Sequence, residues 1–273
     1  MPTVRSADGT PIGYERTGDG PAVVLVDGAL CHRDFNGQRP LAALLADRFT
    51  AYTYDRRGRG ESGDTAPPAP EREVEDLAAV LAATGGPAMV HGISSGAALV
   101  LHAAAAGLPI TRFAIYEVPF APDADAHAEQ RTAIAAVRAA LAAGDRGRAV
   151  RLFLRLVGVP AFGIAIMRLT PAYRRLQAVA HTLPYDLALL GADADRSAPD
   201  SLAWDRIAVP ALVLAGGRSP EANLVGPTRR VAESLPDGTF DVVEGQNHMV
   251  RPDALAPLLA EFFAAEVTAG PAG

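Results

Sequence analysis

Residues 88–106 read AMVHGISSGAALVLHAAAA, and this stretch decides the fold. Its first apolar residues predict a short buried strand, and its last twelve residues, rich in alanine and leucine, predict a helix. Between the two, Gly92-Ile93-Ser94-Ser95-Gly96 fits the pattern G-x-S-x-G. A strand, a sharp turn and a helix in this order lift a serine hydroxyl clear of the sheet. Ser94 is therefore the candidate nucleophile, and the backbone N–H of Ser95 can face developing negative charge.

Short apolar runs and longer helical patterns alternate on both sides of this stretch. The other predicted strands are Ala22–Val26, Thr50–Tyr54, Phe113–Tyr116, Ala211–Ala215 and Phe240–Val243. The other helices predicted around them are Leu41–Asp47, Glu71–Ala83, Thr228–Ser234 and Pro252–Ala265. Continuous apolar runs suit parallel strands that are covered on both faces. The alternation therefore predicts an α/β fold with a doubly wound, mostly parallel sheet, in which functional residues follow the carboxyl ends of strands.

One long stretch breaks this alternation. From residue 122 to residue 205 no strand is predicted, and Ala126–Ala143, Arg148–Leu156 and Pro171–Ala180 have helical patterns. We expect residues 1–121 and 206–273 to form the α/β core and residues 122–205 to form a helical cap or lid inserted between strands. The large apolar side chains of the cap could line a pocket or only pack its helices together: Phe153, Phe162, Ile166, Met167, Tyr173 and Tyr185.

A serine hydroxyl needs a base that takes its proton before it can attack a carbonyl. Of the six histidines, His248 follows the last predicted strand and precedes the last helix. In a doubly wound sheet that loop lies at the same edge as the turn that carries Ser94. His91 extends from a strand, where we expect it to support the turn, and His102 lies inside a helix. His248 is therefore the candidate base.

The carboxylate that would orient this base is not where it is usually found. It commonly follows the strand at residues 211–215, but Ser219 stands at that position, and serine cannot stabilise an imidazolium ion as a carboxylate does. Glu117, Glu221 and Asp241 are the carboxylates that could replace it. Glu117 is favoured because it ends a strand beside the Ser94 turn. A site without any acid is the remaining alternative.

The chain resembles the α/β-hydrolase superfamily over nearly its whole length. The resemblance lies in the serine turn, in His248, in Asp27-Gly28 after the first strand of the core, and in the run from Asp55 to Ser62, which reads DRRGRGES. A closer resemblance is to zearalenone-type lactonases, on residues 27–29, 92–97 and 117–119. In those enzymes the triad is Ser-His-Glu, and the glutamate follows the earlier strand.

These resemblances imply a catalytic triad of Ser94, His248 and Glu117, with an oxyanion hole at Gly28, Ala29 and Ser95. The implied reaction is hydrolysis of a small apolar ester or lactone through an acyl-enzyme, without a metal or an organic cofactor. Two other functions remain possible interpretations of the sequence. One is an acyltransferase or a cofactor-free lyase or cyclase on the same fold, and the other is a protein that binds small molecules without catalysis.

Composition limits the binding partners and the cellular location that we expect for this protein. The formal charge of −6 over 273 residues argues against nucleic-acid binding, and one cysteine cannot form an intrachain disulfide. Residues 1–6 lack the apolar segment of a secretory signal, and no apolar run is long enough to span a membrane. We therefore expect a cytoplasmic protein that binds neither nucleic acid nor membrane. A homo-oligomer is compatible with the sequence.

Overall fold

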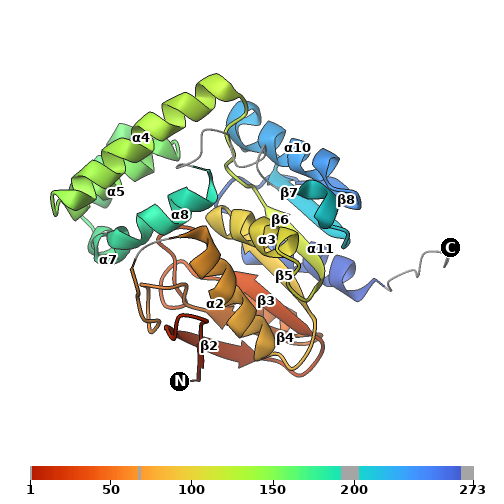
Figure 1. Ribbon diagram of the computed structural model, residues 1–273. Helices are drawn as coiled ribbons and strands as arrows, with labels where there is room; N and C mark the ends of the chain where they lie inside the picture. The colour runs from red at the N-terminus through yellow and green to blue at the C-terminus, as the bar shows by residue number, and fades with distance from the viewer. Residues whose placement is uncertain (1, 67–68, 192–202, 266–273) are drawn as a thin grey trace.

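The computed structural model describes residues 2–66, 69–191 and 203–265, and its described strands form a single sheet (Figure 1). The strand order is β1-β2-β4-β3-β5-β6-β7-β8. Their bounds are β1 Thr3–Arg5, β2 Pro11–Thr17, β3 Ala22–Val26, β4 Thr50–Tyr54, β5 Ala88–Ile93, β6 Ile110–Tyr116, β7 Ala211–Gly216 and β8 Gly238–Val243. The six strands β4-β3-β5-β6-β7-β8 pair in parallel. At one edge of the sheet, β1 pairs antiparallel with β2, and β2 pairs antiparallel with β4. The predicted fold class is confirmed.

Helices cover both faces of this sheet and build a separate core on each. Helices α1 (Arg39–Leu45) and α11 (Pro252–Ala264) pack on one face. Helices α2 (Pro70–Ala82), α3 (Ser95–Ala105) and α10 (Gly226–Ser234) pack on the other. Strand β3 divides its side chains between the two cores, which explains why its sequence is apolar at every position.

Between β6 and β7, the residues that the structure describes form five helices, in the stretch that the sequence predicts to be helical (Figure 1). They are α4 (Ala124–Ala142), α5 (Arg146–Leu156), α6 (Ala161–Met167), α7 (Pro171–Val179) and α8 (Leu183–Leu189). Helix α8 packs beside α3, where Leu183 and Leu187 are buried in the same apolar core as Leu99. The described part of this stretch contains no strand, so we refer to α4–α8 as the cap helices.

The structure also contains strands and helices that the sequence pattern does not predict. Strands β1 and β2 are absent from the prediction, because β1 spans only three residues and β2 mixes charged residues with a few buried ones instead of forming a continuous apolar run. Helices α6 and α8 are also absent from the prediction, although the stretch that contains them is expected to be helical. Among the cap side chains, Tyr173 and Tyr185 are buried, but Phe162 and Ile166 are exposed and therefore do not fill a core.

In the part of the chain that the structure describes, short helical turns also occur at Ala180–Thr182, Trp204–Arg206 and Glu221–Val225. Within the described ranges, no helix has both the length and the apolar character needed to cross a bilayer.

Candidate active site

The carboxyl ends of strands β5 to β8 stay in register beyond the last residues of the strands. The N–H of Ser94 donates to the carbonyl of Tyr116 at 3.0 Å, and the N–H of Glu117 donates to the carbonyl of Leu214 at 2.9 Å. The ladder continues where Gly217 donates to the carbonyl of Val243 at 3.1 Å. The turn after β5, the loop after β6 and the loops after β7 and β8 therefore meet at one edge of the sheet.

Ser94 occupies a strained turn at this edge. Its backbone has φ 58° and ψ −123°, a region that residues with a Cβ rarely adopt. The flanking glycines allow the turn to close, because a Cβ at Gly92 would lie 2.5 Å from the carbonyl oxygen of Gly96. A Cβ at Gly96 would in turn lie 2.5 Å from the carbonyl oxygen of Val26. The geometry is that of the strand, turn and helix expected for a nucleophilic serine.

Glu117 and His248 form a direct contact. Oε2 of Glu117 lies 2.7 Å from Nδ1 of His248. The carboxylate is completely buried, whereas the imidazole is about one-third exposed. Glu117 also has a positive φ of 47°, so a second strained residue lies at this edge.

The second oxygen of Glu117 is held by the strand end from which the usual acid is missing. Oε1 accepts a hydrogen bond of 2.8 Å from the backbone N–H of Gly216, the last residue of β7. The phenol of Tyr116 donates to the carbonyl of Asn247 at 2.7 Å and so ties β6 to the residue before His248. The sequence prediction missed both contacts, because neither a backbone N–H nor a tyrosine inside an apolar strand carries a motif.

The other carboxylates considered for the acid lie elsewhere. Glu221 is exposed and pairs with Arg229 at 2.9 Å, and Asp241 is exposed and bonds the next backbone N–H in β8. The hydroxyl of Ser219 is buried and has no hydrogen-bond partner in the described residues.

Two other histidines form hydrogen bonds with backbone carbonyl groups. His91 is fully buried and its Nδ1 lies 3.1 Å from the carbonyl oxygen of Ala114, while His102 reaches the carbonyl oxygen of Leu189 at 3.0 Å. Burial lowers the pKa of His91 to about 4, and it lowers that of His102 as well. Both imidazoles are therefore neutral supports of the fold near neutral pH.

The candidate oxyanion residues flank Ser94 from two directions. A Cβ at Gly28 would lie 3.2 Å from Cβ and 3.8 Å from Oγ of Ser94, so the backbone after β3 passes directly beside the serine. Among the described residues, the backbone N–H groups of Ala29 and Ser95 have no hydrogen-bond acceptor. Leu30, which follows Ala29, has a positive φ of 60°. An oxygen placed beside Ser94 can therefore be served by two N–H groups that the fold leaves free.

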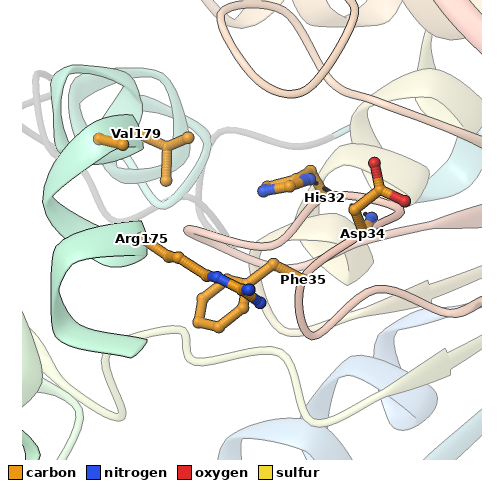
Figure 2. Close-up of a pocket in the computed structure, with 6 residues that line it drawn as sticks. His32, Asp34, Phe35, Arg175 and Val179 are labelled. Carbon is orange, nitrogen blue, oxygen red and sulfur yellow. Dashed lines mark hydrogen bonds between the residues drawn. The ribbon is translucent and has the colours of Figure 1, made fainter. Parts of the chain in front are cut away.

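A pocket of about 240 Å³ opens where the loop after β3 meets helix α7 (Figure 2). Its lining residues are His32, Asp34, Phe35, Arg175, Ala178 and Val179. The guanidinium of Arg175 lies over the ring of Phe35, 5.6 Å from its centre. His32 is three residues from Ala29, so the pocket begins close to the candidate oxyanion loop. It combines apolar walls with basic and acidic side chains.

Comparison with known proteins identifies the family and the fold. The model of the alpha/beta hydrolase family matches residues 23–258. A crystal structure of an alpha/beta hydrolase from Sphaerobacter thermophilus has 47% sequence identity and a TM-score of 0.84, and the match covers 96% of this chain and 100% of that one. A search of curated proteins gives no match.

Two structures of lower identity share the fold. A thermophilic esterase from Thermogutta terrifontis has 20% identity and a TM-score of 0.68, with 96% of this chain and 97% of that chain covered. The enol-lactonase from Burkholderia xenovorans has 20% identity and a TM-score of 0.69, with 97% and 100% covered. Since the family model spans most of the sequence and one relative is nearly half identical over almost the whole chain, this protein belongs to the alpha/beta hydrolase family.

Proposed function

We propose that this protein is a serine hydrolase that cleaves a carboxylic ester or a lactone through an acyl-enzyme. The observation that carries the proposal is the 2.7 Å contact between Glu117 and His248. It lies at the edge of the sheet where Ser94 follows strand β5. A carboxylate can only accept a hydrogen bond, so it keeps the proton of the imidazole on Nδ1. Nε2 is then free to act as the base for Ser94.

The proposed reaction has two steps. His248 takes the proton of Ser94 while Oγ attacks the carbonyl carbon, and the N–H groups of Ala29 and Ser95 stabilise the oxyanion. His248 then gives that proton to the leaving alkoxide as the C–O bond breaks. In the second step a water molecule loses a proton to His248 and attacks the acyl group, and the free acid leaves as Ser94 regains its proton. Glu117 stabilises the imidazolium in both steps.

The proposed substrate class is supported by a sequence resemblance and by structural neighbours. The resemblance of residues 27–29, 92–97 and 117–119 to zearalenone-type lactonases favours a cyclic ester, and one structural neighbour is an enol-lactonase. Other neighbours are esterases, which favour an open ester. Each shares about a fifth of its residues with this chain. The proposal therefore extends to the ester bond and includes its cyclic form.

The test compares wild type with Ser94→Ala on p-nitrophenyl acetate and butyrate and on a panel of aliphatic and aromatic lactones. Product analysis accompanies each assay. We expect wild type to release one equivalent of free acid per ester cleaved and Ser94→Ala to lose nearly all turnover. Mass spectrometry after treatment with a fluorophosphonate should show one adduct, on Ser94.

Three outcomes would count against the proposal. Products without free acid would indicate acyl transfer or lyase chemistry. Turnover that survives Ser94→Ala would rule out this nucleophile. Failure of the fluorophosphonate to label a folded wild type, together with inactivity on every ester and lactone, would indicate a binding protein.

A further inference from the structure

The run DRRGRGES places three arginine side chains in the interior, and they point to different partners. Arg56, Arg57 and Arg59 are at most 1% exposed. Buried guanidinium groups are costly unless each is paired and hydrogen-bonded, so their partners indicate what they hold in place. Arg56 and Arg59 reach the candidate oxyanion loop and the cap helices, whereas Arg57 does not.

All three guanidinium nitrogens of Arg59 are occupied. Nη1 donates to the carbonyl oxygen of Gly28 at 2.9 Å, Nη2 donates to Oδ2 of Asp186 at 2.6 Å, and Nε donates to Oγ1 of Thr182 at 3.0 Å. Asp186 belongs to helix α8, and Thr182 belongs to the turn just before it. One side chain from the core therefore joins the cap to the backbone beside Ser94.

The carbonyl of Gly28 and the N–H of Ala29 belong to the same peptide unit. That unit is planar and trans, so its C=O and N–H point in opposite directions. A donor fixed on the oxygen therefore also fixes the direction of the N–H. A charged donor further polarises the unit, which strengthens the hydrogen bond that the N–H can give on its other side.

We propose that Arg59 is a positioning residue, which aims and polarises the N–H of Ala29 toward the oxyanion, and that Asp186 of the cap holds Arg59 in place. The inference rests on the proposed function, because it assigns a task within that reaction. It makes helix α8 a structural part of the oxyanion hole, although α8 supplies no group to the reacting atoms.

Asp186 is suited to this task by its partners. It is 1% exposed, and its Oδ1 accepts from Nη1 of Arg56 at 2.7 Å and from the hydroxyl of Ser95 at 2.7 Å. Burial alone would raise the pKa of Asp186, but the charges of Arg59 and Arg56 hold it below its ordinary value. The carboxylate therefore stays ionised and bonds residues on both sides of the candidate oxyanion hole.

The second donor is fixed in a comparable way without a charge. The N–H of Ser95 shares its peptide unit with the carbonyl of Ser94, which accepts from the N–H groups of Ala97 at 2.9 Å and Ala98 at 3.3 Å. The first turn of α3 thus sets the Ser95 N–H. The Ala29 N–H lies outside a helix, and the carbonyl of its peptide unit, that of Gly28, accepts from Arg59 at 2.9 Å and from the N–H of Cys31 at 3.4 Å. Arg59 is the charged and the closer donor of the two.

Arg57 offers a matched control. It is as buried as Arg59, and it pairs with Asp76 through two bonds of 2.7 Å and with Asp8 at 3.1 Å. Removing Arg57 takes from the buried Asp76 its arginine partner, and removing Arg59 leaves the buried Asp186, within the described ranges, with Arg56 and Ser95 only, so either change should lower stability. Only the loss of Arg59 also removes the charged donor from the carbonyl of Gly28, which then accepts, among the residues that the structure describes, from the N–H of Cys31 alone, at 3.4 Å.

The experiment compares Arg59→Gln, Arg59→Lys and Arg57→Gln on an ester and on its thionoester analogue, in which sulfur replaces the carbonyl oxygen. Sulfur accepts hydrogen bonds weakly, so the ratio of kcat/KM for the two substrates measures the oxyanion hole. Unlike the activity itself, this ratio does not change with the fraction of molecules that is folded. Loss of a complete donor typically lowers kcat by ~10²–10³.

We expect Arg59→Gln to lower kcat on the ester by about 10- to 100-fold with KM nearly unchanged, and to lower the ester-to-thionoester ratio by about 10-fold. Arg59→Lys, which keeps a charge, should recover part of the ratio, and Arg57→Gln should keep the wild-type ratio. If the Arg59 variants do not fold, Thr182→Val should still lower the ratio measurably, because it keeps the guanidinium but removes its Nε partner, together with the bond from Thr182 to the carbonyl of Val179.

An unchanged ratio in folded Arg59→Gln, or in Thr182→Val where Arg59→Gln does not fold, would overturn the inference and leave the proposed function standing. The same holds if Arg57→Gln lowers the ratio as much as Arg59→Gln does. Wild type without turnover that depends on Ser94 would overturn both.

Discussion

Glu117 and His248 are 131 positions apart in the sequence, yet Oε2 of one lies 2.7 Å from Nδ1 of the other. Two features hold the pair together. The N–H of Gly216 fixes the second oxygen of the glutamate, and the phenol of Tyr116 fixes the carbonyl of Asn247 beside the histidine. The pair therefore depends on three consecutive parallel strands and their loops.

The first prediction concerns the acid. Glu117→Gln places an amide where the carboxylate bonds His248, so it can no longer stabilise an imidazolium and can favour the wrong tautomer. We expect kcat on an ester to fall by ~10³–10⁴, with little change in KM. Glu221→Gln changes an exposed glutamate of the same charge and should keep wild-type kinetics. Equal effects of both substitutions would mean that Glu117 is not the acid.

The second prediction concerns the space beside the nucleophile. A Cβ at Gly28 would lie 3.2 Å from Cβ of Ser94 and 3.3 Å from the carbonyl oxygen of Ile93, so Gly28→Ala must displace the loop or the serine. We expect kcat to fall by about 10- to 100-fold, because loss of one oxyanion donor has an effect of ~10²–10³. Steady-state kinetics would measure this fall.

Gly86→Ala is the control, because a Cβ there would meet nothing within 4 Å. Its kinetics should match those of wild type. Wild-type kcat in Gly28→Ala would show that the backbone at Gly28 does not approach the reacting atoms.

The third prediction concerns the loop that carries His248. Tyr116→Phe removes one buried hydrogen bond to Asn247, which is worth about 1–2 kcal/mol. We expect a lower free energy of unfolding and a several-fold fall in kcat, since the imidazole becomes less well placed. Tyr54→Phe is a suitable control: the Tyr54 hydroxyl is buried and has no partner in the described part of the chain. That change should leave activity intact, and a fall of equal size there would argue against a role of the loop.

The fourth prediction concerns Asp27, which is 3% exposed. Burial raises the pKa of Asp27 to about 7, against ~3.9 for an unfolded aspartate. Between these values the folded chain keeps a proton that the unfolded chain releases, so this group lowers stability as pH rises from about 4 to about 7. Asp27→Asn removes the ionisation and can still accept from the N–H of Gln38.

We therefore expect Asp27→Asn to have a higher Tm than wild type near pH 8 and a similar Tm near pH 4. Thermal unfolding followed by circular dichroism across this range would measure the difference. Asp19→Asn, at an exposed position, should follow wild type at every pH. If the two Tm curves of wild type and Asp27→Asn run parallel, Asp27 does not titrate in this window.

The sequence alone determined the class of fold and the position of Ser94. Both follow from local properties of the chain. Apolar runs with β-branched residues form strands, and the glycines around Ser94 permit a tight turn that residues with a Cβ would obstruct. The same holds for His248, because the last loop of a doubly wound sheet ends at the edge where the first loops do. Strand β2 and helices α6 and α8 have no comparable local signal.

Only the tertiary structure decided which carboxylate meets His248 and which arginine meets Gly28. Glu117, Glu221 and Asp241 were all open in the sequence, and the order β5-β6-β7-β8 brings the first of them within reach of the imidazole. Arg57 and Arg59 are equally buried and two positions apart, yet they point to different helices. Such choices depend on contacts between segments far apart in the chain, and no local pattern of residues records them.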